Sequence, residues 1–440
     1  MKTEVLKKLH QLLIKGHTVC TDSRQAKPGT IFFALKGENF NGNLFALKAI
    51  EKGSVAAVVD EKTIAGKNLI FVDNVIDNLQ QLSLFHRKLF DLPIIGITGS
   101  NGKTTTKELL LAVLSTTYNT LATTGNLNNH IGVPLTLLGL KPEHEMAIIE
   151  MGANHIGEIG HLSAIAMPGF GLITNIGKAH LEGFGSLENI IKTKTELYRH
   201  VKSQGGLLFV NGDNLLLCEK SEGARVVFYG KGENHHCSGK LTREHPFVNL
   251  EFQVNKNFGK AFAGINGQIC TQLAGAYNFE NIMAALTIGL FFGVRPEKAI
   301  AAIESYVPTN SRSQLIENSR NNILLDAYNA NPTSMAAAIE NFSGFGHSPR
   351  AVMLGDMLEM GDSSTEEHIR VFSLLLEKNF ELNILVGPEF KAIAKAVNNT
   401  MTFDTSSAAA EWLSKNPIKG YHILIKGSRG IQMEKVLDSL

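Results

Sequence analysis

The chain has 440 residues, a formal net charge of +1, 44% hydrophobic residues and 19% charged residues. At about 150 residues per domain this length predicts two to four domains, and the composition excludes a disordered or fibrous protein. The near-neutral charge, with no local run of lysine and arginine, argues against a protein that binds nucleic acid.

Neither disulfides nor membrane segments are expected. The cysteines lie far apart and form no C-x-x-C pair, which argues against a disulfide framework or a cysteine-rich zinc site and favours a reducing cytoplasm. Residues 1–16 carry leucines on one helical face, but charged residues interrupt them, so we expect the first helix of the fold and not a signal peptide. The longest apolar run, 282–294, is shorter than the ~20 residues that span a bilayer.

The first 90 or so residues predict a small α/β unit. Apolar runs indicate strands at 30–35, 55–59 and 68–72 and a helix over 45–52. Two polar stretches, 21–24 and 36–42, lie at strand or turn edges where a ligand can bind. Each stretch taken alone is more typical of an ordinary turn.

The stretch GITGSNGKTTT, residues 96–106, lies between an apolar run and a segment of helical periodicity. Strand, glycine loop and helix form the usual context of a phosphate-binding loop, because the backbone N–H groups and the helix dipole point at one place. The two glycines are separated by two residues, whereas a standard P-loop has four. Lys103 is expected to reach the β/γ-phosphates and the Thr104 hydroxyl to bind Mg²⁺. We predict ATP binding by Gly99, Ser100, Asn101, Gly102, Lys103, Thr104 and Thr105.

Candidate ligands follow two later strands. Residues 123–134, rich in asparagine and glycine, predict either a ligand loop or a long surface turn. Glu150 ends an apolar strand beside the expected P-loop strand, where it is either a second magnesium ligand or an ordinary strand end. His180 follows another apolar strand, 171–176, and is expected at the same edge of the sheet.

The motifs in the rest of the central region do not point to a single function. A helix over 188–200 presents Lys192 and Lys194, which periodicity alone interprets as a solvated face. Residues 205–275 predict short strands, and His235, His236 and Cys237 within them indicate a polar loop more than a metal site. Asn278 and Asn281 share one face of a following apolar helix, where they either read a purine or cap the helix.

From about residue 308 the pattern of strand, polar loop and helix repeats, which predicts a doubly wound parallel sheet. No dinucleotide fingerprint is present. The expected ligand edge of this sheet carries Asp326, Asn329, Asn331, Asp356, Lys426 and Arg429.

Taken together, these motifs resemble the Mur ligase family over essentially the whole chain. They are TDSR, FALKGENFNGN, GSNGKTTT, GNLNNHIGVPLTLL, EMGANHIGEI, TNIGKAHLEGFGS, DAYNANPTSM, LGDMLEMG and IKGSRG. The resemblance implies an α/β protein of three domains: a small α/β domain (1–88) that binds the UDP substrate, a central P-loop ATPase domain with a mostly parallel sheet (89–310), and a Rossmann-like C-terminal domain (311–440).

The resemblance also implies an activity. DAYNANP points to an ATP-dependent ligase that joins D-alanyl-D-alanine to UDP-N-acetylmuramoyl-tripeptide through an acyl phosphate, in peptidoglycan precursor synthesis. A cytoplasmic monomer is expected, with closure of the third domain onto the second when ATP binds. The alternatives are the sibling ligase for the third stem residue, folylpolyglutamate synthase, or a P-loop ATPase that is not a ligase.

Site residues carried over by this resemblance fall into five overlapping groups. The UDP part of the substrate is assigned to Ser23, Arg24, Lys36, Asn41, Asn126, Asn128 and Asn129. Two Mg²⁺ ions are assigned to Thr104, Glu150, His180 and a carbamylated Lys194, with Lys192 as the competing candidate. ATP also meets Asn278, Asn281, Arg312 and Asp326, and the dipeptide meets Tyr328, Asn329, Asn331 and Arg429. Lys103, Glu150, His180 and Lys194 are the expected catalytic residues. Tyr277 and Ser311 depart from the family pattern, which usually has histidine and often glycine there.

Overall fold

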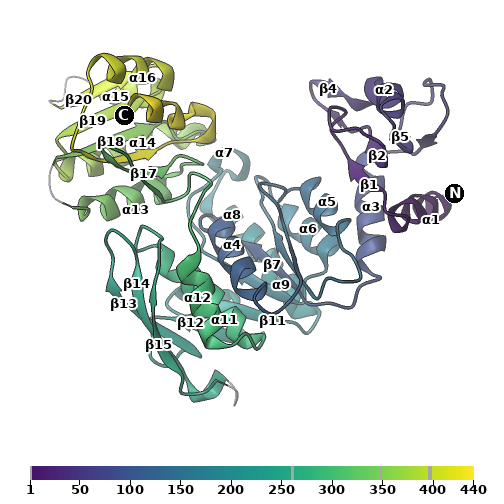
Figure 1. Ribbon diagram of the computed structural model, residues 1–440, viewed down its shortest axis with the longest axis horizontal. Helices are drawn as coiled ribbons and strands as arrows, with labels where there is room; N and C mark the ends of the chain where they lie inside the picture. Colours follow the sequence, from purple (N-terminus) through teal and green to yellow (C-terminus); the bar gives the residue numbers. More distant parts are fainter. Residues whose placement is uncertain (1, 259–261, 347–348, 395–398) are drawn as a thin grey trace. The chain divides into compact units, whose positions relative to one another are not determined.

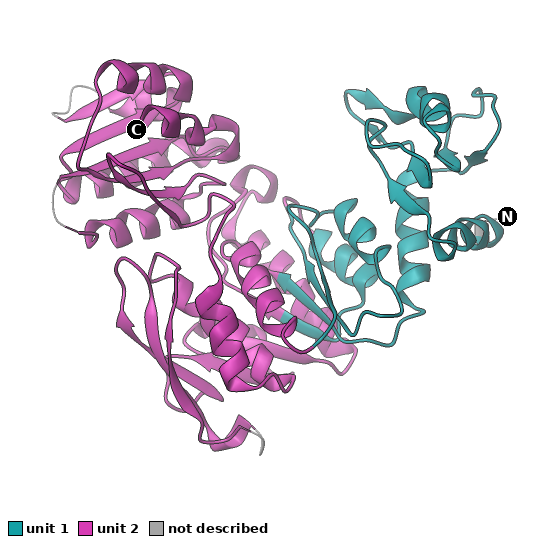
Figure 2. Ribbon diagram, viewed as in Figure 1, with its two compact units in different colours: residues 1–97, 118–153, 157–171 teal, residues 98–117, 154–156, 172–440 magenta. Residues whose placement is uncertain are grey.

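The computed structural model describes residues 2–258, 262–346, 349–394 and 399–440. They form two compact units, which Figure 2 shows in different colours. Unit 1 comprises residues 1–97, 118–153 and 157–171, and unit 2 comprises residues 98–117, 154–156 and 172–440. The chain therefore leaves unit 1 at the end of the strand that precedes the glycine loop.

Unit 1 begins with the predicted small α/β fold. Its four-stranded parallel sheet has the order β1-β2-β5-β6. Along β2 the side chains alternate between two apolar cores: Ile31 and Phe33 pack with α1 and α3, and Phe32 packs with α2. The elements are α1 (Lys2–Ile14), β1 (Thr18–Cys20), β2 (Thr30–Phe33), β3 (Lys36–Gly37), β4 (Phe40–Asn41), α2 (Ala46–Glu51), β5 (Ala56–Val59), β6 (Leu69–Phe71) and α3 (Val75–Arg87).

The remainder of unit 1 is built on three parallel strands in the order β7-β9-β8. In this register Ile97 of β7 lies opposite Glu150, the last residue of β9. Helices α3, α5 and α6 pack on one another. The elements are β7 (Ile94–Thr98), β8 (Thr120–Ala122), α5 (Gly132–Leu137), β9 (Met146–Glu150) and α6 (Glu158–Ala166).

Unit 2 begins with α4 (Lys103–Leu114), which starts at the predicted lysine and packs against α11 and α12 (Figure 1). Its first sheet runs β10 to β15 in chain order, parallel from β11 to β13 and antiparallel from there to β15. The elements are β10 (Phe170–Ile173), α7 (Leu181–Phe184), α8 (Leu187–Lys194), α9 (Glu196–Ser203), β11 (Leu207–Asn211), α10 (Leu215–Lys220), β12 (Arg225–Gly230), β13 (Cys237–Arg243), β14 (Asn249–Val254), β15 (Asn266–Cys270), α11 (Asn278–Phe291) and α12 (Pro296–Ser305).

The C-terminal sheet has six strands in the order β16-β17-β21-β18-β19-β20, and only β16 is antiparallel. Successive residues of β17 enter two cores, with α13, α14 and α15 on one face and α16 on the other, as a doubly wound fold requires. The elements are β16 (Gln314–Glu317), β17 (Asn322–Asp326), α13 (Pro332–Ser343), β18 (Arg350–Gly355), α14 (Ser364–Glu377), β19 (Leu382–Val386), α15 (Pro388–Ile393), β20 (Thr400–Phe403), α16 (Ser406–Lys415) and β21 (His422–Lys426).

Two predicted elements differ from the structure. The helix expected over 188–200 is broken into α8 and α9 at Thr195, whose hydroxyl donates to the carbonyl groups of Ile191 and Lys192. The strand expected over 171–176 ends at Ile173. Within the described residues, no helix is both long and apolar enough to cross a membrane.

Candidate active site

The glycine loop joins β7 to α4 with two glycines in the left-handed region, Gly99 at φ +148° and Gly102 at φ +80°. A Cβ on Gly99 would lie 2.0 Å from the Thr174 hydroxyl oxygen, and one on Gly102 would lie 2.5 Å from Asn281 Oδ1. Both positions therefore require glycine for conformation and for space.

The segment that follows β10 holds this loop in place. The Thr174 hydroxyl donates to the Asn101 carbonyl at 2.6 Å, Asn175 Oδ1 accepts from the Asn101 N–H at 2.9 Å, and the Ser100 hydroxyl donates to the Gly177 carbonyl at 2.9 Å. Lys103 Nζ donates to the carbonyl groups of Gly99 and Ser100. The loop is thus shaped by protein contacts, with its lysine folded over it.

The two asparagines predicted to meet adenine are buried. Asn278 Nδ2 donates to the Ala274 carbonyl at 2.7 Å, Asn281 Nδ2 donates to Asn278 Oδ1 at 2.8 Å, and Asn281 Oδ1 accepts from the Thr106 hydroxyl at 3.0 Å. This chain of bonds links α11 to the P-loop helix. The adenine role stays a prediction.

His180 forms a contact with an acidic side chain that sequence reasoning missed. Its Nδ1 contacts a carboxylate oxygen of Glu359, and this hydrogen bond lowers the pKa of Glu359. Nearby, Lys178 binds Glu367, and the Glu182 N–H donates to the Glu359 carbonyl at 3.1 Å. The motif LGDMLEMG was the available signal, but nothing in it identified Glu359 as a partner of His180.

The two candidate lysines of α8 differ in exposure. Lys194 is 2% exposed, and its Nζ lies 5.8 Å from the centre of the Phe184 ring. Lys192 is exposed. The solvated-face interpretation is therefore wrong for Lys194 and holds for Lys192.

At the C-terminal sheet, Asp326 binds the buried Lys426 at 2.6 Å. Lys426 also donates to the carbonyl of Asn329, whose side chain is exposed. Asn331 caps α13, because its Oδ1 accepts from the Ser334 N–H, while its Nδ2 donates to Asn101 Oδ1 at 2.8 Å. A predicted dipeptide residue thus contacts the P-loop directly.

Two further predicted residues of this sheet, Arg312 and Arg429, have their guanidinium groups over the ring of Tyr328. Asp356 is buried and accepts the N–H groups of Glu389 and Phe390 at the start of α15.

The two departures from the family pattern have local explanations. Tyr277 donates to or accepts from the Ser313 hydroxyl at 2.7 Å, and burial raises the pKa of its phenol. Ser311 has φ +57°, a conformation that favours glycine.

In unit 1 the structure brings together two of the predicted residues: Asn128 Nδ2 donates to Glu150 Oε1 at 2.8 Å, and Glu150 is 1% exposed. Asn129 Oδ1 accepts N–H groups of the first turn of α5, and the Asn126 side chain is exposed. The segment 123–134 is therefore a loop as expected, except that α5 already begins within it.

The basic residues predicted to bind UDP have acidic partners. Arg24 binds Asp22 through two nitrogens, and this hydrogen bonding lowers the pKa of Asp22 to about 2. Lys36 binds Asp60 at 2.9 Å and Glu61 at 3.2 Å, and Glu61 also accepts from Asn41. The Ser23 carbonyl accepts from Lys52. Arg24 and Lys36 are thus held by separate carboxylates.

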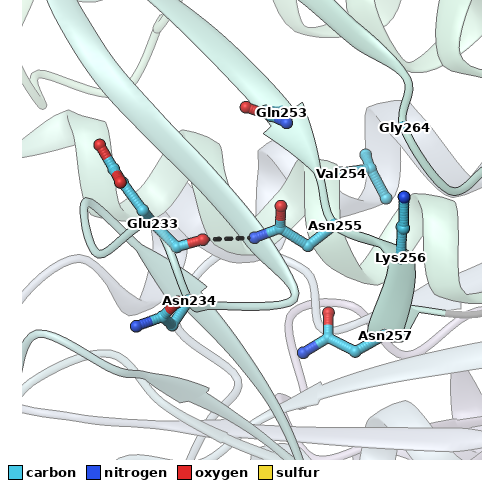
Figure 3. A pocket seen from close by; sticks show the side chains of 8 residues that line it. All are labelled: Glu233, Asn234, Gln253, Val254, Asn255, Lys256, Asn257 and Gly264. Carbon is cyan, nitrogen blue, oxygen red and sulfur yellow. Dashed lines mark hydrogen bonds between the residues drawn. The ribbon is translucent and has the colours of Figure 1, made fainter.

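Two other features lie outside the predicted site. His235 binds Asp213 and His236 Nδ1 accepts from the Phe228 N–H, and no cluster of metal-ligating side chains exists in the described parts of the chain. Figure 3 shows a pocket where Asn255 donates to the Glu233 carbonyl, and its volume is about 400 Å³. It is lined by Glu233, Asn234, Gln253, Val254, Asn255, Lys256, Asn257 and Gly264, none of which was predicted to bind a substrate.

A glycine loop between a buried strand and a helix is typical of a P-loop nucleotide-binding protein. Three families match the chain: "Mur ligase family, catalytic domain" at residues 15–83, "Mur ligase middle domain" at 97–289 and "Mur ligase, glutamate ligase domain" at 311–429. The chain belongs to the Mur ligase family, which consists of ligases.

Similar proteins cover nearly the whole chain. UDP-N-acetylmuramoyl-tripeptide–D-alanyl-D-alanine ligase of Bacillus subtilis is 35% identical, and that of Escherichia coli is 33% identical, each over 96% of this chain and 93% of the relative. The crystal structure of MurF from Acinetobacter baumannii has a TM-score of 0.85 at 32% identity, covering 96% of this chain and 93% of that one. MurF from Thermotoga maritima in complex with ADP has a TM-score of 0.84 at 27% identity, covering 97% of both chains. The predicted three-domain α/β fold is confirmed.

Proposed function

We propose that the chain joins D-alanyl-D-alanine to the terminal carboxylate of UDP-N-acetylmuramoyl-tripeptide, with conversion of ATP to ADP and phosphate, in peptidoglycan precursor synthesis. The observation that carries the proposal is similarity over nearly the full length to relatives named for this reaction. The P-loop geometry supports the use of ATP, because both of its glycines are sterically required.

The residue types suit the chemistry of amide formation. A carboxylate is a poor electrophile, so ATP first phosphorylates it to an acyl phosphate. The amine of the dipeptide then attacks the acyl carbon, the C–O bond to phosphate breaks, and phosphate leaves while the amine loses a proton. Lys103 and the N-terminus of α4 stabilise the phosphate charge, and no covalent enzyme nucleophile is required.

Magnesium fits the oxygen donors assigned to it. Glu150 is a buried carboxylate at a strand end and Thr104 is a buried hydroxyl, and Mg²⁺ takes one or two such protein oxygens beside phosphate and water. When bound, the ion neutralises phosphate oxygens. For a second ion we assign His180 and carbamylated Lys194; burial supports Lys194 over the exposed Lys192.

The substrate residues are assigned by domain. Ser23, Arg24, Lys36, Asn41, Asn126, Asn128 and Asn129 bind the UDP substrate, and Arg24 and Lys36 exchange their carboxylate partners for phosphate oxygens on binding. Asn278, Asn281, Arg312 and Asp326 act at ATP, and Tyr328, Asn329, Asn331 and Arg429 act at the dipeptide.

The proposal is tested by phosphate release with ATP, the tripeptide nucleotide and D-alanyl-D-alanine, each omitted in turn. Release is expected only with all three present. Release that is independent of both acceptor substrates would identify an ATPase of another kind. Equal release with a single amino acid in place of the dipeptide would favour a sibling ligase.

The carbamate assignment predicts chemical rescue. Lys194→Ala removes the modified side chain, so activity is lost and partly recovers when short-chain carboxylic acids replace the missing carboxylate. Lys192→Ala is the matched control and keeps full activity without the additive. A fully active Lys194→Ala enzyme would remove this lysine from the site.

A further inference from the structure

The ring of Tyr328 lies under two arginines. It follows β17 by two residues, and the Arg312 Cζ atom is 3.6 Å from the centre of its ring, which is van der Waals stacking distance. The Arg429 Cζ atom is 5.9 Å from the same centre, near the outer limit of a cation–π contact. The Tyr328 ring therefore contacts both Arg312, which is assigned to ATP, and Arg429, which is assigned to the dipeptide.

The backbone directs Arg312 at this ring. Its neighbours Ser311 and Ser313 have φ values of +57° and +51°, so the chain turns sharply on both sides of the arginine. The Tyr328 N–H donates to the Ser311 carbonyl at 3.2 Å, and the Ser313 N–H donates to Asp326 Oδ1 at 3.2 Å. Both ends of the turn are thus bonded to the segment that carries the tyrosine.

The partner of an arginine decides whether its positive charge is neutralised. Arg24 and Arg370 bind carboxylates, which neutralise them. The Arg312 Nε–H is buried and has no hydrogen-bond partner in the described parts of the chain. A ring fixes the plane of a guanidinium but leaves its full positive charge for an anionic ligand.

We propose that Tyr328 is a positioning residue: its ring holds the Arg312 guanidinium, still charged, in place for the phosphates of the nucleotide. This inference rests on the proposed function only for the identity of the nucleotide and changes the role first assigned to Tyr328, from dipeptide contact to support of an arginine. The ring is the required part, and the hydroxyl is dispensable.

The test measures binding of ADP with Mg²⁺ to the full chain by calorimetry. Tyr328→Phe keeps the ring and binds ADP within about twofold of wild type. Tyr328→Leu removes it and weakens binding about 5- to 30-fold, which corresponds to a partly desolvated cation–π contact of about 1–2 kcal/mol. In an Arg312→Ala background the same Leu substitution changes binding less than about twofold, because the partner is already absent.

Phe380→Leu is the matched control. Phe380 carries a comparable contact with Arg350, 5.1 Å from Cζ to the ring centre, in the core of the same sheet. This variant lowers the thermal unfolding midpoint and leaves the ADP dissociation constant unchanged.

Three results would overturn the inference: unchanged ADP binding in Tyr328→Leu, equal losses in the Phe and Leu variants, or an undiminished Leu effect without Arg312. Ligation by the wild-type enzyme is measured separately. A chain that binds ADP but does not join the dipeptide would refute the proposed function and leave the Tyr328 test intact.

Discussion

At the scale of single residues, Gly102 is a position of the P-loop that has no room for a side chain. Alanine there adopts a left-handed backbone at a cost of about 1 kcal/mol, and its Cβ would lie 2.5 Å from Asn281 Oδ1. Asn281 is bonded to Thr106 and Asn278, so it resists displacement. We expect Gly102→Ala to weaken ADP binding at least about tenfold, measured by calorimetry, and to lower the thermal unfolding midpoint.

Gly205→Ala separates the cost of the left-handed backbone from the cost of the steric contact with Asn281. Gly205 has φ +68°, but a Cβ there meets no atom within 4 Å. This variant therefore bears the backbone cost alone and keeps its affinity for ADP. Equal loss of ADP binding in both variants would show that the contact with Asn281 is irrelevant.

At the residue level, the sequence predicted those features that depend on local pattern. The P-loop, the helix start at Lys103 and the position of Glu150 at a strand end follow from apolar periodicity and glycine spacing, and the structure confirms them. The partners His180–Glu359 and Asn101–Asn331 are 179 and 230 residues apart. No local pattern encodes such pairs, because tertiary packing decides them.

At the scale of elements, two histidines join α1 to α3. His86 Nε2 lies 2.9 Å from the Leu140 carbonyl, which can only accept, so this nitrogen carries the proton and Nδ1 accepts from His10 Nε2 at 3.1 Å. Burial lowers the pKa of both rings. Below about pH 6.5 the unfolded chain therefore binds more protons than the folded one. The free energy of unfolding decreases as the pH is lowered through this range.

Urea unfolding followed by circular dichroism at pH 7.5 and 5.5 measures this loss. Because the pKa values of other half-buried histidines, such as His200 and His236, are lowered as well, the comparison needs a variant. His10→Gln keeps a donor toward His86 but does not titrate, so its stability depends less steeply on pH. Parallel pH profiles for the variant and the wild type would contradict the predicted role of the pair.

Element prediction succeeded where burial sets the pattern and failed where a side chain bonds to the backbone. The strands and helices of the C-terminal sheet follow from apolar runs of the right length. The break at Thr195 does not, because its hydroxyl and the Arg199 guanidinium bond to the Lys192 carbonyl without changing the hydrophobic period.

At the scale of the whole molecule, the segment 306–310 connects α12 to the C-terminal sheet and is fixed to the P-loop helix. Glu108 on α4 accepts from the Tyr306 hydroxyl at 2.5 Å and from Asn310 Nδ2 at 3.0 Å. Burial and this carboxylate raise the pKa of Tyr306. Because α4 begins at Lys103, the same helix carries the lysine that we assign to the phosphates and the anchor of the connection between domains.

This anchor predicts that loss of Glu108 exposes the connection to proteolysis. In Glu108→Ala, the hydrogen bonds of Tyr306 and Asn310 to a charged group disappear, and chymotrypsin is expected to cleave after Tyr306 about tenfold faster than in the wild type, as followed by mass spectrometry. Glu108→Gln keeps one acceptor oxygen and is cleaved at a rate between the two. ADP should slow cleavage in the wild type and protect Glu108→Ala much less, since the helix no longer restrains the segment. Cleavage of Glu108→Ala at the wild-type rate would show that the segment is held by other contacts, and that α4 does not transmit nucleotide binding to the C-terminal domain.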